Sequence, residues 1–406
     1  MVKKKSIFPI TKLSDVVSMK SGESITAERI TSEGKFPCFG GNGFRGYTTT
    51  FTHDGSYTLV GRQGALCGNV TFVSGRFYAS EHAIVVTPKK ETDIKFMSYV
   101  LYDMNLNQYS ESSAQPGLSV KKILELEYPI PKNKEEQTAI AEALSDMDSL
   151  ISSLQKLIEK KKAIKQGAMQ ELLTGKKRLP GFNKEWEELN FAASAKLKAR
   201  IGWQGLTTSE YLQSGFAYLI TGTDFHSGRI KWDTCHFVDE KRYKQDLNIQ
   251  IKKHDILLTK DGTIGKVAYI SDIQKPTTLN SGVFVIRPAK ENSFDPNFVY
   301  HVLNSFIFDN FLAKLSAGST INHLYQKDFV GFTFKAPSEL VEQQAIAQVL
   351  SDMDNDIDQL EKKLAKCQQI KQGMIQELLT GRIRLVDVDV KKSPEAHMVR
   401  EKQHQP

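Results

Sequence analysis

The sequence predicts an α+β fold in which two β-rich domains are joined by two long helices that form an antiparallel intramolecular coiled coil with pseudo-twofold symmetry. Three observations support this prediction: an internal repeat, an apolar heptad in each copy of the repeat, and two glycine-punctuated β-rich stretches. The chain has 406 residues, of which 40% are hydrophobic and 25% charged. That length and composition suit two domains that each bury a core of their own.

A helical segment occurs twice in the chain. Residues 136–179 align without a gap with residues 342–385, and 26 of the 44 aligned positions are identical. The identical blocks include L-S-D-M-D at 144–148 and Q-E-L-L-T-G at 170–175, and each block recurs 206 positions later. Because chance rarely reproduces blocks of this length, the two segments are expected to have equivalent structures.

Both copies carry apolar residues at alternating spacings of three and four, which is the pattern of a coiled-coil seam. One such stripe alone would more often indicate packing on a domain core, but two similar copies favour pairing with each other. Gly175 and Gly381 follow the last apolar turn, where glycine commonly ends a helix. Each helix should be about 60 Å long at a rise of about 1.5 Å per residue. The coiled-coil and partner-docking candidates are Leu144, Met147, Ile151, Leu154, Ile158 and Leu172 in the first copy, and Leu350, Met353, Ile357, Leu360, Leu364 and Leu378 in the second.

Polar residues interrupt both seams. Lys161 and Lys165 occupy seam positions in the first copy, and Cys367 and Lys371 occupy them in the second. Polar residues at such positions select the register and the partner of a helix at some cost in stability.

The repeat divides the chain into five segments. They are a first domain at 1–134, a helix at 135–179, a second domain at 180–340, a second helix at 341–385 and a polar tail at 386–406 that is expected to be disordered. If each helix meets its preceding domain in the same way, antiparallel pairing relates the two halves by a pseudo-twofold axis. The motif W-x-x-L-x-F at 186–191 resembles F-x-x-T-x-L at 8–13, so the exit of the second helix should lie near Phe8.

Each domain contains a β-rich middle. The first domain reads YTLVGRQGALCGNVTFV and then ASEHAIVVTP, and the second reads DILLTKDGTIGKVAYI and then LNSGVFVIRP. Such β-branched runs separated by glycine turns predict hairpins in a curled sheet. Outside these stretches the domains differ greatly, which suggests related tasks performed on different targets.

Composition and motifs disfavour several classes of protein. The net charge of +7 favours a polyanionic partner. The four cysteines have neither C-x-x-C spacing nor an accompanying histidine cluster, so we expect no zinc site and no disulfide framework, and free thiols suit a reducing cytoplasm. Neither a secretory signal nor a membrane-spanning run is expected. F-G-G-N-G at 39–43 loosely matches a methyltransferase cofactor loop, but no N-P-P-Y-like motif and no phosphate-binding loop accompany it, so we expect no catalysis and no bound cofactor.

The chain up to its polar tail resembles the specificity (S) subunit of type I restriction-modification enzymes. The resemblance rests on E-Q-x-x-I-A-x-x-L-S-D-M-D at 136–148, its second copy at 342–354, the Q-E-L-L-T-G ends, I-G-W-Q-G-L-T-T-S-E-Y-L from Ile201 and Y-L-I-T-G-T-D-F from Tyr218. It implies that each domain is a target recognition domain that reads one half of a bipartite, asymmetric site on double-stranded DNA. It also implies a non-catalytic chain whose helices set the gap between the halves and dock two methyltransferase (M) subunits. S-adenosylmethionine, ATP and Mg would then belong to the M subunits and to restriction (R) subunits.

Polar residues in glycine-containing loops are the candidates for DNA contact. Arginine pairs with guanine and glutamine with adenine through two hydrogen bonds each, lysine contacts phosphate or guanine, and aspartate accepts from the amino group of cytosine. Each loop would otherwise be a solvated turn, and Trp203 would otherwise be a core residue. The candidates are Arg45, Arg62, Gln63, Ser113, Gln115, Trp203, Gln204, Thr223, His226, Lys260, Asp261, Thr263, Lys266, Ser319, Thr320, Asn322 and His323.

The sequence also leaves open a function from a different class. The chain would be an interaction scaffold if the coiled coil were its functional part and the domains bound protein or RNA. A fused single-chain restriction enzyme is disfavoured because the catalytic motifs are lacking. A domain swap separates the first two hypotheses, because only a DNA-reading chain would then change the methylated motif.

Overall fold

The computed structural model describes residues 6–110, 116–201, 205–316 and 323–386. The chain divides into two compact units: unit 1 comprises residues 1–155 and 362–406, and unit 2 comprises residues 156–361. Each unit therefore combines one β-rich domain, called domain 1 or domain 2 below, with part of each long helix. The predicted mixture of helix and sheet is confirmed.

Two helices of 39 residues correspond to the repeated segment: α4, Lys134–Leu172, and α9, Leu340–Leu378. Both end several residues before the limits expected from the repeat, because the chain turns at Gly175 and Gly381. These glycines have φ angles of +70° and +73°, a left-handed conformation that is costly for other residues. The expected glycine termination of both helices is confirmed.

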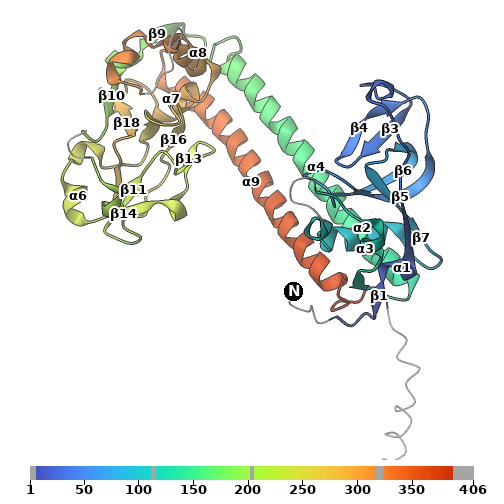
Figure 1. Cartoon of the computed structure of the whole chain (residues 1–406). Coiled ribbons are helices and arrows are strands. Elements are labelled where there is room, and N and C mark those ends of the chain that lie inside the picture. Colours follow the sequence, from blue (N-terminus) through green and yellow to red (C-terminus); the bar gives the residue numbers. More distant parts are fainter. Residues whose placement is uncertain (1–5, 111–115, 202–204, 317–322, 387–406) are drawn as a thin grey trace, which may run out of the picture. The chain divides into compact units, whose positions relative to one another are not determined.

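Domain 1 is built on a six-stranded sheet with the strand order β2-β7-β5-β6-β3-β4 (Figure 1). Neighbouring strands are antiparallel except for β3 and β6, which are parallel. The strands are β2 Val17–Ser21, β3 Phe36–Gly40, β4 Gly43–Thr48, β5 His53–Gly61, β6 Val70–Ala79 and β7 Ala83–Pro88. Strands β5 and β6 form the predicted hairpin, which is thereby confirmed.

Short elements complete domain 1. They are β1 Ile10–Lys12, α1 Leu13–Val16, the 3-10 turns η1 Ala27–Arg29 and η2 Leu106–Tyr109, α2 Ile94–Asp103, α3 Val120–Leu124 and β8 Glu127–Pro129. Strands β1 and β8 pair in a separate two-stranded sheet. The buried residues Phe96 and Val100 of α2 share one core with Ile84 of the sheet and with Ile140 of α4. Helix α2 therefore joins the sheet to the long helix.

Domain 2 contains four small sheets within its described residues. Their strand orders are β10-β18-β15-β16, β14-β11-β17, β12-β13 and β19-β9. The strands are β9 Trp186–Asn190, β10 Ala195–Lys198, β11 Ala217–Ile220, β12 Phe225–His226, β13 Arg229–Ile230, β14 His236–Val238, β15 Ile256–Thr259, β16 Val267–Tyr269, β17 Thr277–Leu279, β18 Val283–Pro288 and β19 Thr333–Pro337. Strands β15 and β16 confirm the second predicted hairpin, and β11 and β17 are parallel.

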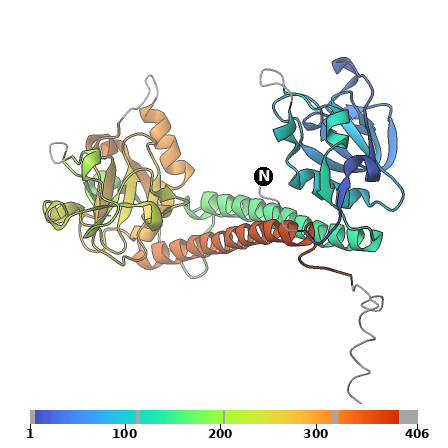
Figure 2. The ribbon, with the colours of Figure 1, turned by 60° about the horizontal axis from the view of Figure 1, so that its bottom comes forward.

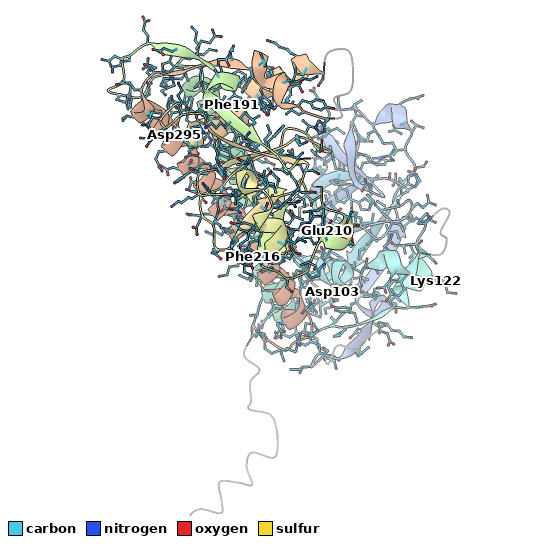
Figure 3. The ribbon with its side chains drawn as sticks, turned by 90° about the vertical axis from the view of Figure 1, so that its left-hand side faces the viewer. Asp103, Lys122, Phe191, Glu210, Phe216 and Asp295 are labelled. Atoms are coloured by element: carbon cyan, nitrogen blue, oxygen red, sulfur yellow. The ribbon has the colours of Figure 1, made fainter. Side chains whose placement is uncertain are left out.

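Short helices and 3-10 turns surround these sheets. They are α5 Phe191–Ser194, η4 Thr208–Glu210, η5 Trp232–Thr234, α6 Glu240–Lys244, η6 Leu247–Ile249, α7 Pro296–Leu303, α8 Phe306–Leu315 and η7 Gln326–Gly331. Asp295, which is labelled in Figure 3, caps α7. Its carboxylate accepts a hydrogen bond of 2.8 Å from the Phe298 N–H. Phe191 and Phe329 lie in an aromatic core beneath α8. The same core includes Ile346 and Leu350 of the long helix α9.

A buried glutamate near the start of each long helix is bound by an arginine that follows the other long helix. In unit 1, Arg384 donates two hydrogen bonds, of 3.0 and 2.8 Å, to Oε2 of Glu136. In unit 2, Arg178 donates hydrogen bonds of 2.6 and 2.7 Å to the two carboxylate oxygens of Glu342. Glu136 and Glu342 are almost completely buried, so the repeated E-Q motif begins with a residue that ties the two copies together.

The glutamine of the same motif binds the domain. In unit 1, Gln137 Oε1 accepts a hydrogen bond of 2.8 Å from the N–H of Asp93, the cap of α2. In unit 2, Gln343 Oε1 accepts one of 2.8 Å from the N–H of Asp295. The two domains are therefore attached to their helices by the same contact.

The exit of α9 lies beside the N-terminal segment within unit 1. The Ile7 N–H donates a hydrogen bond of 3.0 Å to the carbonyl of Thr380. A Cβ on Gly381 would lie 3.0 Å from the ring of Phe8, and the Arg384 guanidinium lies 5.3 Å from the centre of that ring. The prediction that the second helix ends near Phe8 is confirmed.

The polar seam residues form ion pairs between the helices within each unit. In unit 1, Lys371 Nζ lies 2.6 Å from Asp148 Oδ1. In unit 2, where the second half of α4 runs alongside the first half of α9 (Figure 2), Lys165 Nζ lies 2.5 Å from Asp354 Oδ1. Lys371 and Asp354 are the repeat counterparts of Lys165 and Asp148, so the two ion pairs are reciprocal.

The apolar seam is buried to different degrees along its length. Leu172 and Leu378 were expected to be buried against the domains or a partner subunit, and they lie in the cores of domain 2 and domain 1. They follow the heptad spacing, but the helix ends are enclosed by the domains. Leu144, Leu154, Ile158, Leu350 and Ile357 are buried, whereas Met147, Ile151, Met353, Leu360 and Leu364 are half-buried.

Candidate nucleic-acid interface

The two domains present the same arrangement of loops at one edge of their sheets. In domain 1, Phe39 at the end of β3 pairs with Ala79 of the parallel strand β6. In domain 2, Ile220 of β11 pairs in the same way with Leu279 of β17. The residue that follows the second strand then donates its N–H to the first strand. Ser80, after β6, donates to the carbonyl of Phe39 (2.8 Å), and Asn280, after β17, donates to the carbonyl of Ile220 (2.9 Å). The equivalence holds although the two domains share little sequence here.

The loop that follows β5 or β15 joins this edge through its backbone. The Arg62 N–H donates to the carbonyl of His82 (2.8 Å), and the Lys260 N–H donates to the carbonyl of Gly282 (2.9 Å). Arg62 and Lys260 also accept, through their carbonyls, hydrogen bonds of 2.9 Å from the N–H groups of Leu118 and Leu324. The structure thus brings together two predicted loops in each domain, those at 62–63 and 116–118 and those at 260–263 and 323–324.

In domain 1 this edge presents a polar cluster. Gln63 is exposed, and its Oε1 lies 3.0 Å from Nδ1 of His82. The other ring nitrogen of His82 lies 3.1 Å from Oε1 of Glu81. Arg62 is half-buried and donates a hydrogen bond of 3.1 Å to Ser21, so its guanidinium is partly committed to the domain.

In domain 2 the corresponding cluster is charged. Lys260 Nζ lies 3.1 Å from His323 Nε2 and 5.5 Å from the ring centre of Phe284, and its side chain is only 12% exposed. Nδ1 of His323 forms an ion pair with Asp261. Lys260 was expected to contact phosphate or guanine directly, but its ammonium group is largely enclosed by its own domain. Asp261 remains 38% exposed and is the accessible member of the cluster.

Further predicted residues lie exposed around these edges. Thr263 and Lys266 are exposed in the β15–β16 turn, and the Lys266 N–H donates a hydrogen bond of 2.9 Å to Thr259. Thr223 is exposed in the loop after β11, where a Cβ on Gly222 would lie 3.6 Å from the side chain of Thr259. This loop therefore lies against the strand that leads to Lys260.

Two predicted residues are exposed on strands. Arg45 is exposed on β4, with its methylene groups against Gly40. His226 is exposed on β12. Seven other candidates lie outside the described residues: Ser113, Gln115, Trp203, Gln204, Ser319, Thr320 and Asn322.

Sequence reasoning missed the residues between β6 and β7 and between β17 and β18. Glu81 and His82 belong to the first connection, and Asn280 and Ser281 belong to the second. A signal for them was present, because a short polar segment precedes the β-branched run in both ASEHAIVV and LNSGVFVI. Asn280 donates a hydrogen bond of 2.7 Å to the hydroxyl oxygen of Tyr211, which fixes the second connection.

Helix α4 presents an additional exposed apolar row. Leu150, Leu157 and Ile164 of α4 are 40%, 40% and 50% exposed and follow each other at seven-residue spacing. This spacing keeps them on one side of a helix, displaced from the buried seam. Sequence reasoning assigned partner docking to the seam and to the exposed flanks of the helices, but it did not name these three residues.

The described part of the chain holds no group of three or more histidine, cysteine, aspartate or glutamate side chains that could bind a metal ion. None of the described helices is both long and apolar enough to cross a membrane.

Comparison with known proteins identifies related chains. Residues 8–166 and 206–372 match the model of the type I restriction modification DNA specificity domain. The EcoprrI specificity subunit of Escherichia coli is 45% identical over 146 residues, which are 35% of this chain and 36% of that protein. The MjaVIII specificity subunit of Methanocaldococcus jannaschii is 28% identical over 315 residues, 72% of this chain and 71% of that protein. The chain thus matches about a third of the length of the first of these relatives.

A solved structure has a similar fold. The type I restriction-modification S subunit from M. genitalium superimposes with a TM-score of 0.69 at 20% identity, over 93% of this chain and 97% of that one. At this identity the likeness concerns the fold. The family match, in contrast, includes both domains and most of both long helices, so the chain belongs to the family of type I restriction modification DNA specificity domains.

Proposed function

We propose that this chain is the non-catalytic, DNA-reading specificity subunit of a type I restriction-modification complex, in which each domain reads one half of a bipartite, asymmetric site. The observation that carries the proposal is the repetition of one loop arrangement with different side chains. Arg62 and Gln63 stand in domain 1 where Lys260 and Asp261 stand in domain 2. Base edges are distinguished by such sets of hydrogen-bond donors and acceptors. Two domains with the same backbone arrangement and different side chains are therefore suited to two different half-sites.

The long helices would set the gap between the half-sites as an antiparallel coiled coil with pseudo-twofold symmetry. Support comes from the reciprocal pairs Lys165–Asp354 and Lys371–Asp148, because polar residues at seam positions select one register. A helix of 39 residues is about 60 Å long, which exceeds one DNA turn of about 34–36 Å. The length is therefore sufficient to hold two readers one turn apart.

The flanks of the helices would dock two methyltransferase subunits. The exposed row Leu150, Leu157 and Ile164 supports this assignment, because a helix of a partner could bury it. In such a cytoplasmic complex, S-adenosylmethionine, ATP and Mg would bind to methyltransferase and restriction subunits and not to this chain.

Methylome sequencing tests the proposal. A host that carries this chain with its methyltransferase subunit should methylate adenines within one bipartite motif. Replacing domain 1 should change one half of the motif, and replacing domain 2 should change the other half. Methylation that stays the same after both replacements would contradict DNA reading and favour the alternative, a coiled-coil scaffold whose domains bind protein or RNA.

A further inference from the structure

In both domains a histidine contacts the second residue of the loop that follows β5 or β15. His82 Nδ1 lies 3.0 Å from Gln63 Oε1 in domain 1. His323 Nδ1 forms an ion pair with Asp261 Oδ1 in domain 2. Gln63 and Asp261 are structurally equivalent, because each directly follows the residue whose backbone binds the connection before β7 or β18.

The two histidines come from different segments of the fold. His82 lies between β6 and β7, whereas His323 lies before η7 and bridges to Asp261 through backbone pairing. The position equivalent to His82 in domain 2 is Gly282, and the residue that pairs with Gln63 in the manner of His323 is Gly117. The two domains make the same contact with histidines from different segments, so the contact does not follow from their shared backbone arrangement. It is a feature that residues 63 and 261 have in common.

Each histidine ring is also held on its far side. Glu81 Oε1 lies 3.1 Å from His82 Nε2, and Glu81 Oε2 accepts a hydrogen bond of 3.3 Å from the Ile25 N–H. Lys260 Nζ lies 3.1 Å from His323 Nε2 and is itself packed on Phe284. Both nitrogens of both rings therefore have partners, which fixes the orientation of each ring.

The contact determines what the held side chain can offer to a base. When His82 carries a proton on both ring nitrogens, it donates to the Glu81 carboxylate and to Gln63 Oε1, and one oxygen lone pair and the amide NH2 group of Gln63 remain available. That pair of groups matches the N6 amino group and the N7 acceptor of adenine. Without the histidine, the amide is free to turn over and exchange its oxygen and nitrogen, which removes the preference. Asp261, with one oxygen bound to His323, offers an acceptor that matches the N4 amino group of cytosine.

We propose that His82 and His323 are positioning residues for specificity, which hold Gln63 ready to read an adenine and Asp261 ready to read the amino group of a cytosine. This inference rests on the proposed DNA-reading function. It adds to that function the side chains that choose the base in each half-site and the residues that orient them.

The test uses the full chain together with its methyltransferase subunit. The variants His82→Ala and Gln63→Ala are compared by sequencing methylated genomic DNA and by measuring Kd for duplexes that carry each of the four bases at the affected position. We expect both variants to relax the same position of one half-site and to lower discrimination there by about tenfold or more. The other half-site serves as the internal control and should be unchanged.

Parallel variants test domain 2. His323→Ala and Asp261→Asn should relax one position of the other half-site. The matched control is His254→Ala, since His254 is exposed in the same domain and its Nδ1 bonds the Tyr269 hydroxyl at 2.6 Å, away from Asp261. It should leave the motif intact.

A conservative variant separates positioning from folding. His82→Asn retains a donor for Gln63 and should recover part of the discrimination that His82→Ala loses. The proposal is overturned if His82→Ala keeps the full motif, relaxes a position other than that of Gln63→Ala, or weakens all four duplexes equally. A wild-type chain that directs no bipartite methylation would instead refute the DNA-reading function itself.

Discussion

Arg384 donates two hydrogen bonds to Glu136, a buried carboxylate that lies 248 positions away in the chain. The same carboxylate accepts a third hydrogen bond, of 3.2 Å, from the Leu385 N–H. A buried charge is tolerated when partners of this kind compensate for lost hydration. The stability of domain 1 therefore depends on a segment that follows the second long helix.

We expect Arg384→Ala to lower the free energy of unfolding of unit 1 by about 3 kcal/mol, because it leaves Glu136 charged, buried and without its cationic partner. Denaturant unfolding of the full chain measures the change. Arg382→Ala is the matched control, since Arg382 pairs with Glu377 at the surface and its loss should cost less than about 1 kcal/mol. If Arg384→Ala and Arg382→Ala lowered the free energy of unfolding equally, the buried Glu136 would not depend on Arg384 as expected.

We expect reversed charges at the seam to be compensatory. Lys165→Asp places two carboxylates together and should destabilise unit 2, whereas the double variant with Asp354→Lys should recover most of the loss. The coupling energy should exceed about 1 kcal/mol, because these side chains are only 17% and 29% exposed. The control is Lys162 with Glu361, an ion pair that is 56% and 38% exposed and should show weaker coupling. A coupling energy for Lys165–Asp354 that is no larger than that for Lys162–Glu361 would argue that the seam pair does not select the register of the helices.

We expect Leu157→Glu with Ile164→Glu to weaken binding of the methyltransferase subunit without unfolding the chain, because both side chains are already exposed. Size-exclusion chromatography of co-expressed subunits measures the binding, and thermal unfolding measures the fold. Leu154→Glu provides the contrast, since Leu154 is 5% exposed and should lower the melting temperature instead. Unchanged subunit binding after the double substitution would exclude this row as the docking surface.

We expect unit 2 to lose stability as the pH falls from 7 to 5. His301 is buried against Ser351, with Lys165 near it, and burial followed by this neighbouring charge lowers the pKa of His301 to about 3. Between that pKa and the ordinary value of about 6.5, the unfolded chain binds a proton that the folded chain does not. The free energy of unfolding of unit 2 is therefore highest above about pH 6.5 and should be lower by about 2 kcal/mol at pH 5.

His301→Gln should remove this pH dependence while keeping a donor for Ser351. Denaturant unfolding at pH 7 and pH 5 measures the slope. The control is His226→Gln, because His226 is exposed and its replacement should leave the slope unchanged. A slope that survives His301→Gln would assign the pH dependence to another group.

The helices, their terminal glycines and the contact near Phe8 were predictable because local periodicity and repeated blocks carry that information. The heptad could not show whether Leu172 enters a domain core or a partner interface, since both kinds of burial have the same spacing. The clustering of Gln63 with His82 depends on β5, β6 and β7 being neighbours in the sheet, and strand order is not written in local sequence. The enclosure of Lys260 was not predictable for the same reason, because Phe284 and His323 reach it from distant segments.

The division of the chain also has a consequence for synthesis. Unit 2 is one continuous stretch, 156–361, whereas unit 1 is assembled from residues at both ends of the chain. Glu136 leaves the ribosome long before Arg384, so domain 1 must wait with an unpaired carboxylate while unit 2 is made. Domain 1 therefore precedes unit 2 in the chain but is completed after it, and a chain that ends before Arg384 would lack the contacts that close domain 1.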